Sequence, residues 1–193
     1  MTGSIGDDLL RRAQAGSPEA RNELYERCAG RLLAFVRLRL GRDLRARLES
    51  RDILQAALLK SVQHLDDVQA ADTRGFMAWL ARIAEHEIRD RVDYHQRQRR
   101  DAAREVPIDE AAAPPAITRS ALSKLILSED ARRLEAALDT LSDLHRDVIL
   151  LRKYQGLSFA EIGRRLGKSE DACRMLLARA MTALTLAMSE VPW

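Results

Sequence analysis

Aromatic residues are scarce in this chain: they make up 4% of its 193 residues, although 46% of the residues are hydrophobic. The abundant residues are Ala, Leu and Arg, which are strong helix formers, so the composition favours helices over sheets. A chain of this length can form one large domain or two small ones, each with its own hydrophobic core.

Cysteine and long apolar runs are also lacking. The two cysteines, Cys28 and Cys173, lie too far apart in sequence for a disulfide framework or a paired metal motif. We expect two buried thiols in a reducing compartment. The opening MTGSIGDDLLRR is acidic and has no long apolar core, unlike a signal peptide, and no stretch approaches the length of a membrane span. These absences predict a cytoplasmic protein without membrane insertion.

The motifs of the common enzyme classes are missing. There is no phosphate-binding glycine loop and no nucleophile elbow. The sequence HEIRD at His86–Asp90 departs from the zinc motif H-E-x-x-H, since Asp90 replaces the second histidine. The other histidines show no metal-ligand or catalytic spacing. We therefore predict that the chain is not an enzyme and uses no metal, cofactor or small-molecule substrate.

Charge is distributed in blocks, although the formal net charge is only +3. Residues 31–50 hold six Arg against two acids, and residues 145–180 hold eight Lys or Arg against four acids. Between them, residues 105–143 hold eight acids against four bases. Two basic blocks therefore flank an acidic one, and basic blocks are typical of nucleic-acid contacts.

The periodicity of apolar residues predicts an all-α fold of two small helical domains. The first domain is expected at 5–100 and has four helices. Ser17 should cap the second helix, which Gly41 interrupts, and Thr73 should cap the fourth. Residues 101–128 contain EVPIDEAAAPPAITRS, with three prolines and no usable periodicity, which predicts a flexible acidic linker. The second domain is expected at 129–190.

The segment LSFAEIGRRLGKSEDACRMLLARA, residues 157–180, has the pattern of a helix-turn-helix. Ser158 and Ser169 should cap its two helices, and Gly167 should form the turn between them. Arg164, Arg165 and Lys168 lie where DNA phosphates would pass. The pattern predicts DNA binding, and the alternative is a helical hairpin that packs on a protein partner. The apolar run Met175–Leu177 is unusual for a helix that enters the major groove.

The run Phe76–Arg100 has two interpretations. Its arginines could follow a nucleic-acid backbone, with Tyr94 and His95 as stacking planes. Acidic residues are interleaved with these arginines, however, and can pair with them at helical spacing, which is typical of a solvated face. The residue pattern alone leaves both interpretations open.

Two segments together resemble bacterial sigma factors. The segment RDILQAALLKSVQHLDDV, followed by DTRGFMAWLARIAEHEIRDRVDYHQRQRRD, is similar to their second conserved region. The segment LEAALDTLSDLHRDVILLRKYQGLSFAEIGRRLGKSEDACRMLLARAMTAL is similar to their fourth region. The two-domain size resembles the extracytoplasmic-function (ECF) group. The resemblance implies a sigma factor that binds core RNA polymerase and promoter DNA and directs transcription initiation.

The resemblance also implies site residues. The residues that correspond to the polymerase contact are Asp52, Gln55, Leu58 and Leu59. Those expected at the minus-ten element are Arg74, Arg82, Glu85, His86, Arg89, Arg97, Arg99 and Arg100. Those expected at the minus-thirty-five element are Arg164, Arg165, Lys168, Ser169, Glu170, Asp171, Arg174 and Arg179. Phe76 and Trp79 are expected in the core.

The chain departs from the family pattern at several positions. Ala56 and Leu58 stand where the motif has Glu and Phe, and His86 stands where it often has Asn. Met175 and Leu176 replace a small polar residue and an Arg, so they should contact thymine methyls or bind a protein such as an anti-sigma factor.

Three other functions remain as alternatives. One is a stand-alone helix-turn-helix regulator, whose two-fold operator binding would not need polymerase. Another is a sigma-like protein with weak initiation activity. The third is a nuclease or nucleotide-handling enzyme, which would require a carboxylate or histidine cluster that the sequence lacks.

Overall fold

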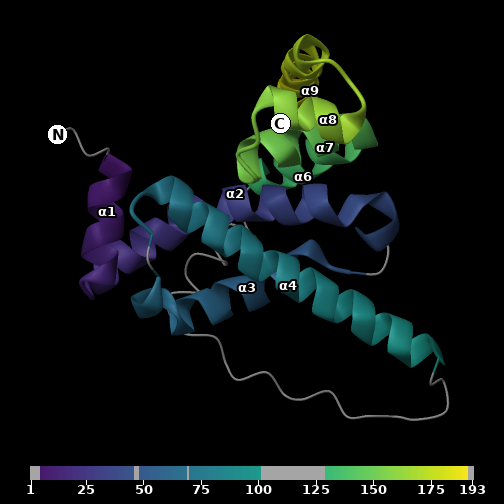
Figure 1. The fold of residues 1–193 in the computed structure, drawn as a ribbon. Helices are drawn as coiled ribbons and strands as arrows, with labels where there is room; N and C mark the ends of the chain where they lie inside the picture. Colours follow the sequence, from purple (N-terminus) through teal and green to yellow (C-terminus); the bar gives the residue numbers. More distant parts are fainter. Residues whose placement is uncertain (1–4, 46–47, 69, 101–128, 191–193) are drawn as a thin grey trace.

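The computed structural model describes residues 5–45, 48–68, 70–100 and 129–190, and every regular element within them is helical (Figure 1). The all-α prediction is confirmed. The predicted linker, residues 101–128, lies outside the described residues.

The first group of helices surrounds a core of leucines and small residues. Its elements are α1 (Ile5–Gln14), α2 (Pro18–Arg45), α3 (Ser50–Gln63), the short 3-10 turn η1 (Leu65–Asp67) and α4 (Thr73–Arg100). Helix α2 crosses both α3 and α4, and α1 packs on the start of α2. This arrangement leaves one long face of α4 open to solvent (Figure 1).

Local signals explain where α2 begins and bends. The Ser17 hydroxyl accepts a hydrogen bond from the Ala20 amide at 3.2 Å, and Pro18 occupies the first helical position, where a missing N–H costs nothing. Gly41 has φ 60° and ψ −178°, so the helix breaks there and resumes for a short stretch to Arg45. The predicted interruption at Gly41 is confirmed.

The cap of α4 differs from the prediction. The Asp72 carboxylate accepts from the Gly75 amide at 2.7 Å, which makes Asp72 the capping residue. The Thr73 hydroxyl and amide donate instead to the Asp7 carboxylate, at 3.3 and 3.2 Å. Thr73 is a residue type that often caps helices, but here its side chain connects the start of α4 to α1 by a hydrogen bond.

The second group is a smaller bundle. Its elements are α6 (Glu129–Thr140), α7 (Asp143–Ile149), the π-helical turn η2 (Leu150–Tyr154), α8 (Phe159–Leu166) and α9 (Glu170–Glu190). Helix α9 packs on α6, α7 and α8. The bundle rests on α2, with α6 lying against it (Figure 1), and the buried apolar residues of both groups form one contiguous cluster.

Candidate functional site

Helix α3 presents a mixed face at the predicted polymerase contact. Asp52 is 59% exposed, whereas Gln55 and Leu59 are half-buried. Arg91 of α4 lies beside Asp52: its Nη1 is 4.0 Å from the carboxylate, and its Nη2 donates to the Asp52 carbonyl at 3.4 Å. Leu58 has no exposed surface and packs in the core, which corrects the expectation that its side chain meets polymerase.

The exposed face of α4 carries a row of basic side chains. Arg82, His86 and Arg89 are exposed and follow one another at helical spacing of four and three residues. Glu85 is half-buried on the flank of this row, where Arg39 of α2 donates to its carboxylate at 3.2 and 3.3 Å. The face therefore carries two arginines and a histidine, with the Glu85 carboxylate on its flank and the exposed Asp90 and Asp93 further along the helix.

The remaining residues predicted on α4 lie at its two ends. Arg74 is exposed in the first turn, and Arg97 is exposed near the last. Arg99 and Arg100 belong to α4, but their side chains lie outside the described residues. Phe76 is fully buried, as predicted. Trp79 is half-buried, with its ring centroid 5.5 Å from that of Phe76.

The helix-turn-helix is formed by α8 and α9. Ser158 and Glu161 make a capping box at the start of α8, and Gly167 has φ 64° at its end. The Ser169 hydroxyl accepts from the Ala172 amide at 3.2 Å at the start of α9. Cys173 is fully buried in the seam between the helices. The predicted caps and turn are confirmed.

The polar face of α9 points to solvent, as predicted. Glu170, Asp171, Arg174 and Arg179 are all exposed, as are Ser169, Arg164 and Lys168. Arg174 pairs with Glu170 and lies 3.6 Å from the Asp171 carboxylate, with its guanidinium 5.3 Å from the Phe159 ring centroid. Arg165 is exposed and donates to the Gln155 side chain at 3.0 Å. Arg165 and Arg174 therefore have intramolecular partners in the free chain.

The apolar run of α9 divides between core and surface. Leu177 and Leu176 are half-buried and pack against the core, whereas Met175 is 56% exposed. Met181 and Leu186 are exposed further along the helix. Leu176 and Leu177 of this run therefore belong to the packing of the bundle, whereas Met175 adds to the exposed surface.

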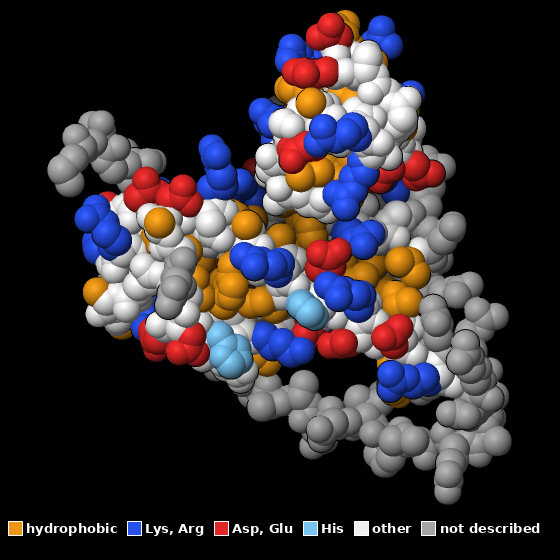
Figure 2. Space-filling view, in the orientation of Figure 1, with side chains coloured by type: hydrophobic (Ala, Val, Ile, Leu, Met, Phe, Trp, Pro, Cys, Tyr) orange, Lys and Arg blue, Asp and Glu red, His pale blue; other side chains and the backbone are white. Residues whose placement is uncertain are grey.

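A cleft of about 890 Å³ opens where the two groups of helices meet. Sequence reasoning did not find it, because it combines residues distant in sequence. Arg31 and Arg74 line it from the first group, Arg152 and Lys153 from the second, and Asp72 is an acid on its wall. Figure 2 shows Lys and Arg side chains near this boundary. The start of α4 therefore faces the second group across a positively charged gap.

Both cysteines are free thiols in the interior of the protein. Cys28 and Cys173 are buried, and burial raises the pKa of the Cys28 thiol to about 11. Among residues 5–45, 48–68, 70–100 and 129–190, no group of three His, Cys, Asp or Glu side chains could hold a metal ion. In the same ranges, no helix is long and apolar enough to span a membrane.

The fold and its surfaces define a two-part, all-helical protein with an exposed helix-turn-helix. The profile of Sigma-70 region 2 matches residues 24–100, and that of Sigma-70, region 4 matches residues 137–185. The chain belongs to the sigma-70 family of RNA polymerase sigma factors, in its ECF group.

Several curated sigma factors match over most of this chain. CarQ of Myxococcus xanthus, an RNA polymerase sigma factor, is 29% identical over 94% of this chain and 97% of its own. The ECF sigma factor BldN of Streptomyces coelicolor is 28% identical over 92% of this chain, which spans 63% of BldN. SigD of Mycobacterium tuberculosis is 26% identical over 95% of this chain and 84% of its own.

A solved structure of CnrH in complex with the cytosolic domain of CnrY is also similar. It covers 98% of this chain and 100% of its own at 23% identity, with a TM-score of 0.41. That score is too low to place the elements of one chain on the other.

Proposed function

We propose that this chain binds core RNA polymerase and directs it to promoters, acting in the cytoplasm as a specificity subunit that catalyses no reaction and needs no cofactor. The single observation that carries this proposal is the pair of region matches, in order, on helices with exposed charged faces. Sigma factors are transcription initiation factors rather than catalysts. In this proposal, residues 5–100 bind polymerase and the minus-ten element, and residues 129–190 bind the minus-thirty-five element. Residues 101–128 connect these two domains.

The polymerase contact is assigned to the outer face of α3. Asp52, Gln55 and Leu59 have surface available there, and Arg91 restrains Asp52. Asp52 therefore offers an exposed carboxylate beside Arg91, whereas Leu59 adds apolar area. Because α3 also packs on α2 and α4, a polymerase surface that grips α3 holds the whole first domain.

The minus-ten contact is assigned to the exposed row on α4. Melted DNA exposes bases and a backbone, and arginines at helical spacing can follow that backbone while a nearby pocket receives an extruded base. Arg82 and Arg89 suit the phosphates, and His86 lies between them. Glu85, held by Arg39, can accept a hydrogen bond from a base amino group.

The minus-thirty-five contact is assigned to the start of α9. A recognition helix contacts base edges with its first residues, and Glu170, Asp171 and Arg174 occupy these positions. Arg174 can exchange its bond with Glu170 for a bidentate contact with guanine. Arg164 and Lys168 reach the flanking phosphates.

An anti-sigma factor is the proposed protein partner of the exposed apolar residues of α9. Met175, which is 56% exposed, is the most amino-terminal of them, and the half-buried Leu176 follows it on the same helix. A Met175→Ser, Leu176→Arg variant should lose affinity for that inhibitor. If this variant bound the anti-sigma factor as tightly as the wild type does, Met175 and Leu176 would not be its contact site.

Binding to core polymerase tests the proposal directly. Gln55→Arg should weaken binding of the full-length chain to purified core polymerase, since it places a long charged side chain on the contact face. Thr182→Arg is the matched control, because Thr182 is exposed on α9 and does not belong to the assigned face of α3. No binding by the wild-type chain would favour the stand-alone regulator. Tight binding without initiation would favour the sigma-like protein with weak activity, which the departures at Ala56 and Met175 suggest.

A further inference from the structure

Four basic side chains line the cleft where the two groups of helices meet. Arg31 of α2 and Arg74 of α4 come from the first group, and Arg152 and Lys153 of η2 come from the second. Asp72 is the one acid among the described lining residues. Its carboxylate accepts from an amide in the first turn of α4 at 2.7 Å, so the positive end of the helix dipole offsets part of its charge. The basic cleft (Arg31, Arg74, Arg152 and Lys153) therefore keeps an excess of positive charge.

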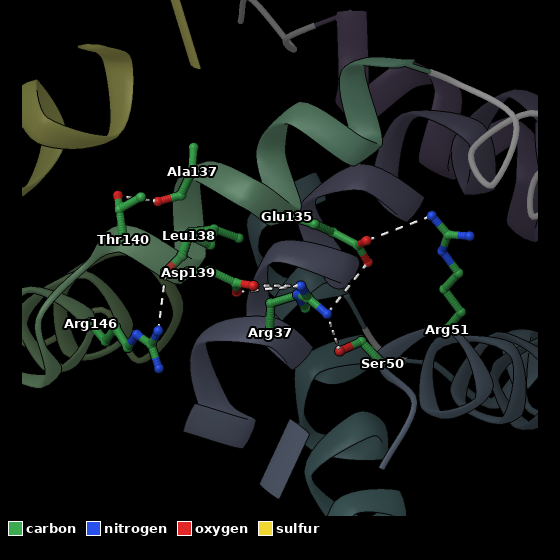
Figure 3. A network of polar contacts seen from close by, with 9 residues as sticks. All are labelled: Arg37, Ser50, Arg51, Glu135, Ala137, Leu138, Asp139, Thr140 and Arg146. Carbon is green, nitrogen blue, oxygen red and sulfur yellow. Dashed lines mark hydrogen bonds and ion pairs between the residues drawn. The ribbon is translucent and has the colours of Figure 1, made fainter. Parts of the chain in front are cut away.

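The arginines at another contact between the two groups have carboxylate partners. Where α6 meets α2 and α3, Arg37 lies 3.9 Å from the Glu135 carboxylate and donates to Asp139 at 3.1 and 3.3 Å (Figure 3). Arg51 lies 3.6 Å from the other Glu135 oxygen. By contrast, no ion pair within residues 5–45, 48–68, 70–100 and 129–190 involves a member of the basic cleft. A cleft lined by one sign of charge concentrates counterions, so this one favours the entry of an anion.

Arg152 is already oriented for such a ligand. Its Nη1 donates to the Leu157 carbonyl at 2.8 Å, and its guanidinium carbon lies 4.6 Å from the Phe159 ring centroid. These two contacts hold the side chain in place and leave its other N–H donors for a ligand. The side chains of Arg31, Arg74 and Lys153 are exposed and can close on an anion from the rim. Ligand binding therefore needs little reorganisation of the cleft floor.

The cleft also has an apolar part. Met77 of α4, Phe159 of α8 and Leu177 of α9 contribute to its lining. Its volume of about 890 Å³ lies within the range of about 300–1,000 Å³ that is typical of small-molecule sites. A single phosphate would fill a small part of that volume. A ligand that joins several phosphates to a flat ring system would use both the basic and the apolar lining.

We propose that the basic cleft binds a nucleoside polyphosphate, with its phosphates at the four basic side chains and its base toward Phe159 and Leu177. The binding site stands on the cleft itself and does not depend on the proposed function. One consequence does rest on the proposed function: Arg74 is also assigned to the minus-ten contact, so a bound nucleotide competes with promoter DNA for this side chain.

The test is calorimetric titration of the full-length chain with ATP. The test variant is Arg31→Gln, Lys153→Gln, which removes one exposed cation of the cleft from each group of helices. The matched control is Arg12→Gln, Arg132→Gln. It also removes one exposed cation from each group, but both lie outside the lining of the cleft. Circular dichroism checks that every variant is equally helical.

The wild type and the control should bind ATP with the same affinity, and the test variant should bind about ten-fold more weakly, because two partly screened charge contacts are lost. Raising salt from about 0.1 to 1 M should weaken binding to the wild type, since the Debye length falls from about 10 to 3 Å. Inorganic tripolyphosphate should bind more weakly than ATP, because it has no group for the apolar lining, and adenosine should not bind. ATP should displace a minus-ten promoter fragment from the wild type more readily than from the test variant.

No ATP binding by the wild type, equal affinity in the test variant, or an equal loss in the control would overturn the proposal. Tripolyphosphate binding as tight as that of ATP would overturn the assignment of a nucleoside. ATP binding that leaves the promoter complex intact would overturn the competition for Arg74. Failure of the sigma-factor assignment is distinguishable, since it would abolish polymerase binding and leave the affinity for ATP unchanged.

Discussion

Replacing Gly163 with alanine is expected to damage the helix-turn-helix, although alanine is the better helix former. A Cβ at this position would lie 2.5 Å from the Lys168 carbonyl oxygen, well inside contact distance. The Gly163 carbonyl also accepts from the Lys168 amide at 2.9 Å. The turn between α8 and α9 therefore passes directly over the Gly163 backbone, and the added methyl group has to push it away.

The expected magnitude follows from two opposing terms. Forcing an extra carbon into a packed site costs about 1–3 kcal/mol, and replacing glycine inside a helix recovers about 1 kcal/mol. The net expectation is a loss of up to about 2 kcal/mol in unfolding free energy. Because the turn orients α9, affinity for the minus-thirty-five element should fall as well.

Urea denaturation followed by circular dichroism measures this loss. Ala160→Gly is the matched control: Ala160 is exposed in the same helix, so the change isolates helix propensity and should cost about 1 kcal/mol. If propensity alone governed α8, Gly163→Ala would stabilise the protein by about the same amount. If Gly163→Ala stabilised the protein and left DNA affinity unchanged, the Lys168 backbone would not lie close enough to residue 163 to exclude a methyl group.

Three further outcomes are expected. Ser158→Ala should lower the unfolding free energy by about 1 kcal/mol, since it removes the capping box of α8; an unchanged urea midpoint would show that the cap contributes nothing. Hydrogen bonds from the Ser158 hydroxyl and amide lower the pKa of Glu161 below its ordinary value of 4.5. The ionised Glu161 carboxylate therefore stabilises the folded protein above pH 4.5, and this contribution is lost as the pH falls through the lowered pKa. The stability difference between wild type and Glu161→Gln should therefore vanish in acid, and a difference that persists there would contradict this cause. Iodoacetamide at pH 8 should modify neither Cys28 nor Cys173 in the native protein, and both in urea, because burial raises the pKa of Cys28 to about 11 and Cys173 has no exposed surface; rapid labelling of the native protein would contradict their burial.

Features encoded by neighbouring residues were predictable from the sequence. The break at Gly41, the cap at Ser158 and the turn at Gly167 each depend on a few consecutive side chains and backbone angles. The same local reasoning placed the exposed face of α9 correctly, because that helix packs on one side only.

Features that depend on distant residues were not predictable. Leu58 was expected at the polymerase contact because it stands at a motif position, yet it shares the apolar face of α3 with Ile53 and Leu54, and α2 and α4 cover that face. Asp72 rather than Thr73 caps α4, because the Thr73 hydroxyl donates a hydrogen bond to Asp7, which is distant in sequence. The blocks of charge were visible in the sequence, but their meeting at Arg37 and Glu135 required the fold.

Run-off transcription with core polymerase, with and without this chain, on a pool of upstream DNA from its own genome tests the central claim most directly. The account predicts specific transcripts that appear only when the chain is present. These transcripts should disappear with Asp52→Ala, which removes a carboxylate from the polymerase face, and with Arg174→Ala, which removes the oriented arginine of α9. Specific DNA binding without any polymerase binding or polymerase-dependent transcript would contradict the account and leave a stand-alone DNA-binding regulator.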